Sequence, residues 1–213
     1  MVNEFGSVDI FCEFLEAAIH QILHARDVYP QELFQRGKLY NVPVQKSRHP
    51  DLNDYVSHLV RSIHGWMSKG GVESVILLIV DSRQQPLERF VFEFRRASSE
   101  EEAAGLPLPA LERMLSAFMT KISLSHAVLR PLPQDCHFQV LVCSPEEGPE
   151  PVPEVPGEPL WLEECPAEGG FGVHTSESPA LSITAPAIVP MKTLRCGSMR
   201  IQLHVEVQPE EAM

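Results

Sequence analysis

Residues 199–207 read MRIQLHVEV, and apolar and polar side chains alternate strictly along the whole stretch. This period of two is typical of a β-strand that buries one face and leaves the other in water. Such a strand needs a sheet beside it, and the sheet available to it is the one predicted for residues 72–143. We therefore expect the last part of the chain to return, as an arm, to the body that precedes it.

Residues 72–143 contain three further strand patterns. Val75–Val80 is short and uniformly apolar, which is typical of a strand buried on both faces. Residues 87–94, LERFVFEF, place their phenylalanines on one side, and we expect this segment to pair antiparallel with the first. Residues 137–143, HFQVLVC, supply another strand.

Three stretches carry apolar residues at helical spacing, and we expect helices over residues 8–27, from Pro50 to Gly70, and over 107–129. Residues 33–45, with a proline inside, favour an edge strand or a hairpin. Helices and antiparallel strands mixed in this way predict an α+β fold.

Residues 144–161, SPEEGPEPVPEVPGEPLW, separate the arm from the body and are too rich in proline and glutamate to pack. We interpret residues 1–143 as the core, 144–160 as a hinge and 161–213 as the arm, all within a single domain. Trp161 is then the first anchor of the arm.

Composition excludes several classes of protein. The net charge is −12, and residues 144–213 hold 12 acids against 3 bases, whereas residues 1–143 hold 17 against 14. No stretch approaches the roughly 18 to 20 apolar residues that a membrane span needs, and the N-terminus lacks the basic start of a signal peptide. The five cysteines are widely spaced and form no C-x-x-C, so we expect reduced thiols in an intracellular protein.

Direct binding to nucleic acid is not expected of so acidic a chain. The exception to its acidity is a group of bases in the predicted hairpin, which we interpret as a solvated edge. A DNA-binding role for this group remains an alternative. The group consists of Arg36, Lys38, Lys46 and Arg48.

Catalytic readings find little support in the sequence. His20 and His24 lie one helical turn apart, with Glu16 and Asp27 nearby, a spacing that can hold zinc but that a solvated polar stripe explains equally well. Cys12 or Cys136 could act as a nucleophile beside a histidine, although Cys12 falls among the apolar residues of the first helix. We therefore expect neither an enzyme nor a cofactor.

Several segments, in this order and spacing, resemble the HORMA-domain family, and most closely its branch that serves as the regulatory subunit of translesion DNA polymerase zeta. The resemblance runs from about Val8 to Val207. It implies three helices packed on a mainly antiparallel sheet, with the arm acting as a seatbelt that closes over a short peptide from a partner. The segments are FCEFLEAAIHQIL, ARDVYP, KLYNVPVQ, HPDLNDYV, ERFVFEF, AFMTKIS and VPMKTL.

The resemblance also implies where partners bind. Tyr29, Tyr55 and Trp161 occupy positions that line the peptide channel in this family; the alternative for Tyr29 and Tyr55 is that they are ordinary half-buried core aromatics. A second surface on the seatbelt, which in the family receives a Rev-one type polymerase, maps onto Ile188, Lys192, Gln202 and His204.

Two positions depart from the family pattern. His204 stands where related proteins have tyrosine, which removes a hydroxyl group and ring area from the second surface. Ser116 stands on the third helix where they carry an arginine central to homodimerisation, so the oligomeric state is left open.

The resemblance implies a non-catalytic adaptor that links the catalytic subunit of polymerase zeta to a Rev-one type Y-family polymerase, in translesion synthesis and double-strand-break repair. It further implies a shieldin-type repair complex and an AAA+ ATPase remodeller as partners, and a nuclear as well as cytoplasmic location. The alternative is a spindle-checkpoint or meiotic HORMA adaptor that regulates the anaphase-promoting complex.

Overall fold

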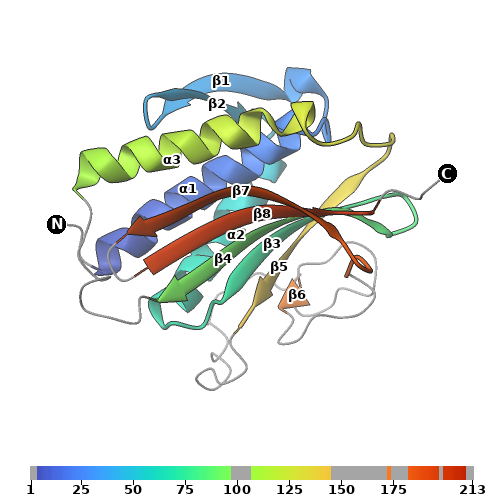
Figure 1. Cartoon of the computed structure of the whole chain (residues 1–213). Helices are drawn as coiled ribbons and strands as arrows, with labels where there is room; N and C mark the ends of the chain where they lie inside the picture. Colours follow the sequence, from blue (N-terminus) through green and yellow to red (C-terminus); the bar gives the residue numbers. More distant parts are fainter. Residues whose placement is uncertain (1–3, 97–106, 145–171, 174–181, 197–198, 210–213) are drawn as a thin grey trace.

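A six-stranded sheet with the strand order β6-β5-β3-β4-β8-β7 lies against three helices, and a separate two-stranded hairpin, β1–β2, packs on the helices (Figure 1). The computed structural model describes residues 4–96, 107–144, 172–173, 182–196 and 199–209. All strand pairs are antiparallel except β5 and β6. The α+β prediction is therefore confirmed.

The helices follow the predicted pattern closely. Their bounds are α1 Glu4–Ala25, α2 Pro50–Ser68 and α3 Leu108–Ser123, and 3₁₀ turns cover Gln31–Leu33 and Ser125–Ala127. Proline stands in the first turn of both α2 and α3, where its missing N–H costs nothing. The third helix is shorter than predicted, because the chain tightens into the second 3₁₀ turn after Ser123. None of the described helices is long and apolar enough to cross a membrane.

The central strand is buried on both faces, as predicted. Every residue of β3, Ser74–Val80, is buried, and the strand pairs with β4, Pro86–Arg96, on one side and β5, His137–Cys143, on the other. Alternate residues of β3 pack against the helices together with the three phenylalanines of β4. The opposite face carries a smaller apolar cluster of Ile76, Leu78, Val80, Val91 and Leu141.

The predicted return of the arm to the sheet is confirmed. β8, Met199–Val207, pairs with β4 along its whole length, and Ile201, Leu203 and Val205 enter the core. The sequence interpretation did not anticipate β7, Ala187–Cys196, which pairs with the other side of β8. The last strand is therefore interior to the sheet and is held by two neighbours. The predicted hinge lies outside the described residues, except for Ser144.

The expectation that β8 leaves one whole face in water is wrong at His204. The side chain of His204 points away from the core residues of β8, yet the residue is only 8% exposed. It lies opposite Val91 of β4, and its Nε2 atom is 3.6 Å from Oε1 of Glu206. This part of the outer face is therefore covered, and it places the imidazole of His204 beside the carboxylate of Glu206.

The expectation of a solvated polar stripe on α1 is wrong at His20, which is 1% exposed. The hairpin formed by β1, Phe34–Leu39, and β2, Val42–Ser47, covers that side of α1. The backbone N–H of Gln45 donates to Oε1 of Gln21, and Lys46 pairs with Glu16 at 3.1 Å. Because the hairpin packs on the face opposite the sheet, α1 is buried on more sides than its sequence pattern indicates.

Candidate partner-binding site

Among the described residues, one edge of the main sheet has no neighbouring strand along most of β5. In the described residues, a strand faces this edge only at Leu141 and Val142, which pair with β6, Gly172–Val173, in parallel. Residues 137–140 have β3 on one side and no described strand on the other. A sheet edge of this kind can pair with an extended segment of another chain.

The main-chain groups along this edge point outward in a defined pattern. The carbonyl of Cys143 accepts a hydrogen bond of 2.8 Å from the N–H of Glu73, so Cys143 faces β3. Main-chain groups alternate in direction along a strand, which turns those of Phe138 and Val140 toward the open edge. The edge therefore offers donors and acceptors for strand addition.

Two of the predicted peptide-binding residues meet at this edge. The rings of Tyr29 and Tyr55 both pack edge-to-face on Phe138, with centroids 6.1 Å and 5.8 Å away. Interplanar angles of 77° and 81° are the geometry that aromatic pairs prefer. All three side chains are partly exposed and lie against the main core. The result is an aromatic cluster beside an open strand.

The end of α1 determines where Tyr29 lies. The helix stops at Ala25, and the left-handed backbone of Asp27 (φ 52°) turns the chain so that the N–H of Val28 bonds to the carbonyl of Leu23. Burial raises the pKa of the Tyr29 hydroxyl, which keeps the ring neutral.

A buried ion pair holds this turn against the sheet. The guanidinium of Arg26 donates to both carboxylate oxygens of Glu88 on β4, at 2.9 Å and 2.7 Å, and also to the carbonyl of Arg130. Burial raises the pKa of Glu88, and the guanidinium of Arg26 opposes this effect. The bidentate contact fixes the end of α1 three residues before Tyr29.

The sequence interpretation missed Phe138. The sequence pattern could have indicated it. Phe138 is the aromatic residue of the predicted strand 137–143, and the alternation of this strand places Phe138 on the same side as Val140 and Val142. Trp161, the third predicted member of the channel, lies outside the described residues and stays a prediction.

The four residues predicted for the second surface lie on β7 and β8. Ile188 is 61% exposed and sits opposite Glu206, and Gln202 is half-buried. These residues and His204 follow one face in register, whereas Lys192 lies opposite the core residue Leu203, just after a bulge. The register therefore groups three of the four predicted residues.

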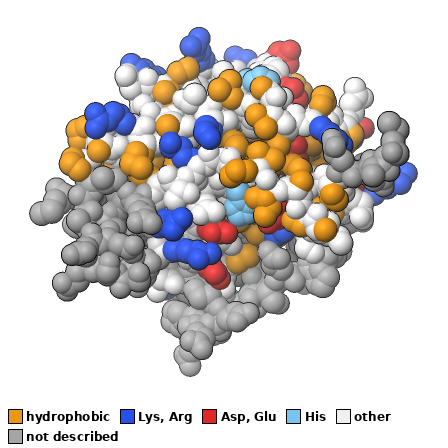
Figure 2. Space-filling view, viewed as in Figure 1, with side chains coloured by type: hydrophobic (Ala, Val, Ile, Leu, Met, Phe, Trp, Pro, Cys, Tyr) orange, Lys and Arg blue, Asp and Glu red, His pale blue; other side chains and the backbone are white. Residues whose placement is uncertain are grey.

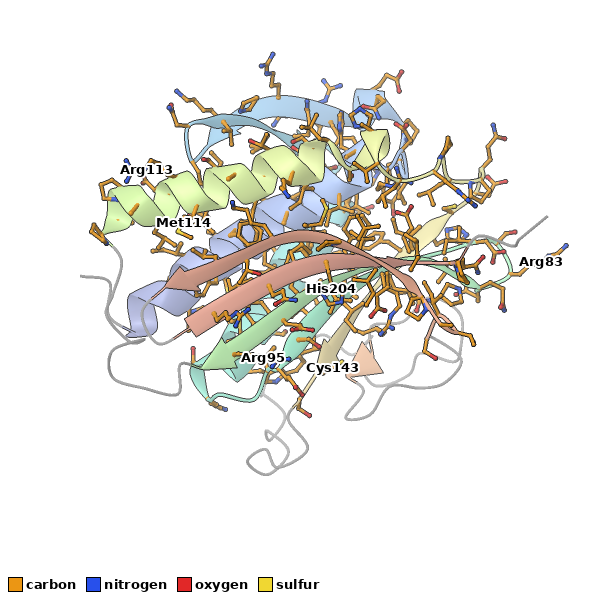
Figure 3. All side chains as sticks on the ribbon, in the orientation of Figure 1. Arg83, Arg95, Arg113, Met114, Cys143 and His204 are labelled. Carbon is orange, nitrogen blue, oxygen red and sulfur yellow. The ribbon has the colours of Figure 1, made fainter. Side chains whose placement is uncertain are left out.

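Charges on this face are paired across strands. Arg89 of β4 donates to Oε2 of Glu206 on β8 at 2.6 Å, and both side chains are largely buried. The pair joins the core to the returning arm, and Nε2 of His204, the residue labelled in Figure 3, is 3.6 Å from Oε1 of Glu206. Ser116, the position linked to homodimerisation, is half-buried on α3 and donates its hydroxyl to the carbonyl of Arg113.

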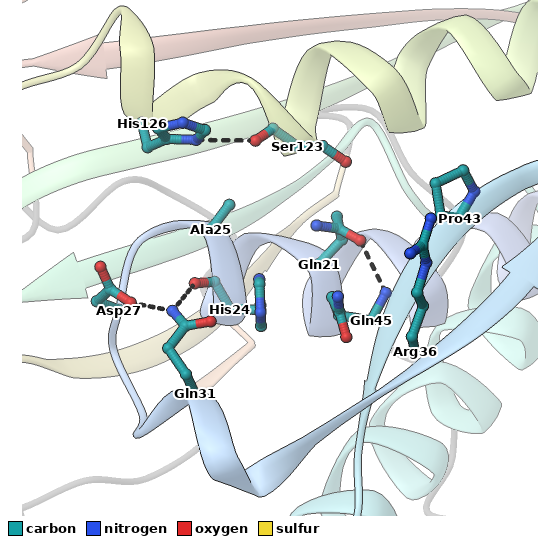
Figure 4. Close-up of a pocket in the computed structure, with 10 residues that line it drawn as sticks. All are labelled: Gln21, His24, Ala25, Asp27, Gln31, Arg36, Pro43, Gln45, Ser123 and His126. Carbon is teal, nitrogen blue, oxygen red and sulfur yellow. Dashed lines mark hydrogen bonds between the residues drawn. The ribbon is translucent and has the colours of Figure 1, made fainter.

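A depression of about 490 Å³ opens elsewhere, between the end of α1, the hairpin and the end of α3 (Figure 4). Its lining mixes Arg36 and Asp27 with amide and imidazole groups, and Asp27 is already bonded by Gln31. Both helix ends that border it present carbonyl groups. The depression therefore combines groups of both charges and indicates no particular cofactor.

Two of the residues weighed for catalysis, His20 and Cys12, are buried. The described residues contain no group of three or more His, Cys, Asp or Glu side chains that could hold a metal ion. Burial lowers the pKa of His20 to about 4, and the ring of His24 packs edge-to-face on Phe34. Burial raises the pKa of the Cys12 thiol to about 12, so that thiol is a poor nucleophile.

Comparison with known proteins identifies the architecture. The model of the family described as HORMA domain matches residues 7–153. This protein belongs to the HORMA domain family. The order of three helices and an antiparallel sheet with a returning C-terminal strand is thus a HORMA fold, as the resemblance implied.

Relatives of this HORMA domain protein have names from two processes. It is 35% identical over 204 residues to human "Mitotic spindle assembly checkpoint protein MAD2B", covering 95% of this chain and 92% of the relative. It is 30% identical over 208 residues to the "DNA polymerase zeta processivity subunit" of Arabidopsis thaliana, covering 96% and 87%.

Solved structures agree with the fold. A chain of "Crystal Structure of Mitotic Checkpoint Complex" superposes with a TM-score of 0.74 at 21% identity, covering 96% of this chain and 99% of the other. Caenorhabditis elegans HTP-2 bound to a HIM-3 closure motif superposes with a TM-score of 0.71 at 13% identity, covering 99% and 94%. At these identities the likeness concerns the fold alone.

Proposed function

We propose that this HORMA domain protein is a non-catalytic adaptor that holds a partner peptide as an added strand at the edge of β5. The observation that carries the proposal is the convergence of Tyr29 and Tyr55 on Phe138, beside outward-facing main-chain groups. Main-chain hydrogen bonds supply affinity in strand addition, and side-chain pockets supply selectivity. The arm that contains β7 and β8 would act as the seatbelt, with Trp161 as a further contact.

The partner that we propose is the catalytic subunit of DNA polymerase zeta. The name of the Arabidopsis relative supports this assignment. Through Ile188, Gln202 and His204, with Lys192, the adaptor would also bind a Rev-one type polymerase, and it would act in the nucleus in translesion synthesis and double-strand-break repair. A shieldin-type complex and an AAA+ ATPase remodeller would be further partners, and we expect no direct contact with nucleic acid or membrane.

A second function is favoured by the name of the human relative. A spindle-checkpoint or meiotic adaptor that regulates the anaphase-promoting complex would use the same edge with a different peptide. The two functions are separated by which protein is retained.

The test is retention of overlapping peptides of the polymerase zeta catalytic subunit by the full-length chain. Replacing Tyr55 with alanine removes one ring from the cluster, and we expect binding to weaken roughly tenfold or more, as for aromatic anchors in other interfaces. Tyr40→Ala is the matched control, because Tyr40 lies at the hairpin and its hydroxyl contacts Glu13 instead. Equal loss in both variants would contradict the proposed site.

To distinguish the two candidate functions, the same experiment needs a second set of peptides, from spindle-checkpoint proteins. Retention of a spindle-checkpoint peptide, with no retention of any polymerase peptide, would favour the second function over the first. Loss of both on Tyr55→Ala would still support the site.

A further inference from the structure

A largely buried ion pair joins the returning arm to the strand beside it. Arg89 of β4 and Glu206 of β8 lie directly opposite one another, and their side chains are 5% and 16% exposed. Nη1 of Arg89 donates to Oε2 of Glu206 at 2.6 Å, whereas Oε1 of Glu206 is 3.6 Å from Nε2 of His204. Figure 2 shows basic, acidic and histidine side chains close together on the visible surface, among apolar ones. Each oxygen of Glu206 therefore lies near a different side chain, which fixes the direction of the carboxylate.

The core face of β8 discriminates weakly between some registers of pairing with β4. Ile201, Leu203 and Val205 follow one another on this face, and all three are branched aliphatic side chains. A shift of one residue would turn them to the opposite face, whereas a shift of two residues would keep aliphatic side chains in the core. Exchanges between apolar side chains of similar volume are well tolerated in protein cores. Burial of this face therefore opposes the shift of one residue much more than the shift of two.

One register shifted by two residues would be favoured by charge at the far end of the strands. In the observed register Arg200 lies opposite Arg95. In the shifted register Arg200 would lie opposite Glu93, and His204 would lie opposite Arg89. Opposite charges that face one another across strands are stabilising, and like charges are destabilising. We refer to this arrangement as the competing register.

The buried ion pair opposes the competing register. That register would leave Arg89 opposite His204 and would place Glu206 opposite Leu87, so the pair would be broken. Leaving one member of a buried ion pair without its partner is strongly unfavourable, because its charge stays out of water. Specifying a register is also the best-attested role of buried polar groups. The pair thus acts against the shift that the apolar face permits.

We propose that the pair of Arg89 and Glu206 is a register lock that decides where the arm closes on the sheet. β7 pairs with β8 and would move with it, so a shift of two residues would displace the arm by about 7 Å along β4. Ile188, which lies opposite Glu206 on β7, would be carried along. The inference goes beyond the proposed function, because it concerns closure of the arm on its own sheet and its test needs no partner.

The test is disulfide trapping in the full-length chain. Val91 lies opposite His204 in the observed register and would lie opposite Gln202 in the competing register. Val91→Cys/His204→Cys therefore reports the observed register, and Val91→Cys/Gln202→Cys reports the competing one. Opposite residues meet the distance that a disulfide requires, whereas diagonal neighbours lie about 7 to 8 Å apart. Mass spectrometry of tryptic peptides distinguishes each cross-link from pairs formed by the chain's own cysteines.

The variant Glu206→Gln keeps the shape of the side chain and removes its charge. With Arg89 and Glu206 intact, we expect the cross-link of the observed register to predominate. We expect Glu206→Gln to raise the fraction of the competing cross-link roughly tenfold, in proportion to one lost charge-assisted contact. Arg89→Glu/Glu206→Arg restores opposite charges and should return the cross-link to the observed register.

Glu16→Gln is the matched control, because it makes the same chemical change in the more exposed pair of Glu16 with Lys46. It should leave both cross-links unchanged. An equal rise of the competing cross-link in this control would overturn the proposal.

Three further outcomes would overturn the register lock. An unchanged cross-link ratio in Glu206→Gln, with a lower melting temperature, would show that the pair stabilises the fold without choosing its register. Failure of Glu206→Gln to fold would do the same, since a chain that can adopt a second register keeps its core. Persistence of the competing cross-link after charge reversal would show that opposite charges at these two positions do not set the register.

Discussion

His20 shows how a single side chain can depart from the solvated role that its helical position indicates. Neither ring nitrogen of this buried histidine has a hydrogen-bond partner among the described residues. Burial lowers its pKa to about 4, and nearby Lys46 acts in the same direction. The folded state therefore holds the neutral ring well below the pH at which an unfolded histidine takes up a proton.

Replacing His20 with leucine should remove a pH dependence from folding. Between pH 6.5 and about 4 the unfolded chain binds the proton and the folded chain does not, so the stability of the unmodified protein falls as the pH is lowered. From pH 7 to pH 5 this contribution is about 2 kcal/mol. Urea unfolding at both pH values would measure it, with the exposed His58→Leu as the control. Parallel pH dependences in His20→Leu and the unmodified chain would contradict the prediction.

Replacing Arg26 should lower the free energy of unfolding strongly at neutral pH. Arg26→Met leaves the buried carboxylate of Glu88 without its cation, which typically costs about 3 to 5 kcal/mol. The pKa of Glu88 then lies above its unfolded value. Protonation of Glu88 therefore stabilises the folded variant fully at low pH. This stabilisation is lost as the pH rises through the folded-state pKa of Glu88.

The Arg26→Met variant should accordingly recover stability as the pH is lowered from 7 toward 5, in urea unfolding followed by circular dichroism. Arg83→Met, at an exposed position, should change stability by no more than about 0.5 kcal/mol. A variant that is equally destabilised at both pH values would argue against a buried, unpaired carboxylate.

At the scale of elements, β8 could be predicted because its alternation is complete, and β3 because it is uniformly apolar. β7 could not be recognised in this way. The residues of β7 that pack against the core, Val189, Met191 and Leu194, are spaced by two and then by three, since a bulge lies between Pro190 and Lys192. β6 is too short to carry a pattern. The covering of α1 by the hairpin is a tertiary contact, so the burial of His20 has no local signal.

The candidate site, like the strands, could be predicted from the sequence only in part. Tyr29 and Tyr55 were assigned through the family resemblance. Neither belongs to a local sequence pattern that indicates a binding site. Their meeting at Phe138 depends on the position of β5 beside the ends of two helices, which no local pattern specifies.

Ending the chain after Cys196 should prevent folding. β8 supplies Ile201, Leu203 and Val205 to the core, and burial of each contributes about 1.5 to 3 kcal/mol. Their sum approaches the total stability of a typical domain, about 5 to 15 kcal/mol. We expect the shortened chain to aggregate in size-exclusion chromatography, because β4 becomes an uncovered edge. A chain ending after Pro209 keeps β8 and should elute as the full-length protein does.

A soluble, cooperatively unfolding product from the shorter chain would contradict this prediction. The result also bears on experiments with the seatbelt. Deleting residues 161–213 removes both β7 and β8, so loss of peptide binding in that deletion would report on folding and could not by itself establish a latch.

At the scale of the whole molecule, β8 and β7 fill the sheet on one side, and on the other side no described strand pairs with residues 137–140 of β5. A peptide added at β5 would extend the sheet without displacing a described strand from residues 137–140. Binding to the folded state alone stabilises a protein by mass action.

A polymerase zeta peptide that binds this edge should therefore raise the melting temperature of the full-length chain. At a free concentration one hundred times the Kd, the gain is about 2.7 kcal/mol, or about 5 to 10 °C for a protein of this size. Differential scanning fluorimetry would measure the shift, with a scrambled peptide as the control. Tyr55→Ala should need more peptide to reach the same shift, and an unchanged dose response would count against the aromatic cluster.

The alternation of main-chain groups along β5 also bears on how such a protein changes clients during evolution. An outward-facing backbone accepts nearly any extended guest, so much of the attraction is indifferent to the guest's amino acids. Under the proposed function, discrimination between guests would be left to the aromatic cluster around Phe138. Under the proposed function, a few substitutions there would be sufficient to redirect the protein while its scaffold stays unchanged. Its relatives are named for the mitotic spindle assembly checkpoint and for DNA polymerase zeta.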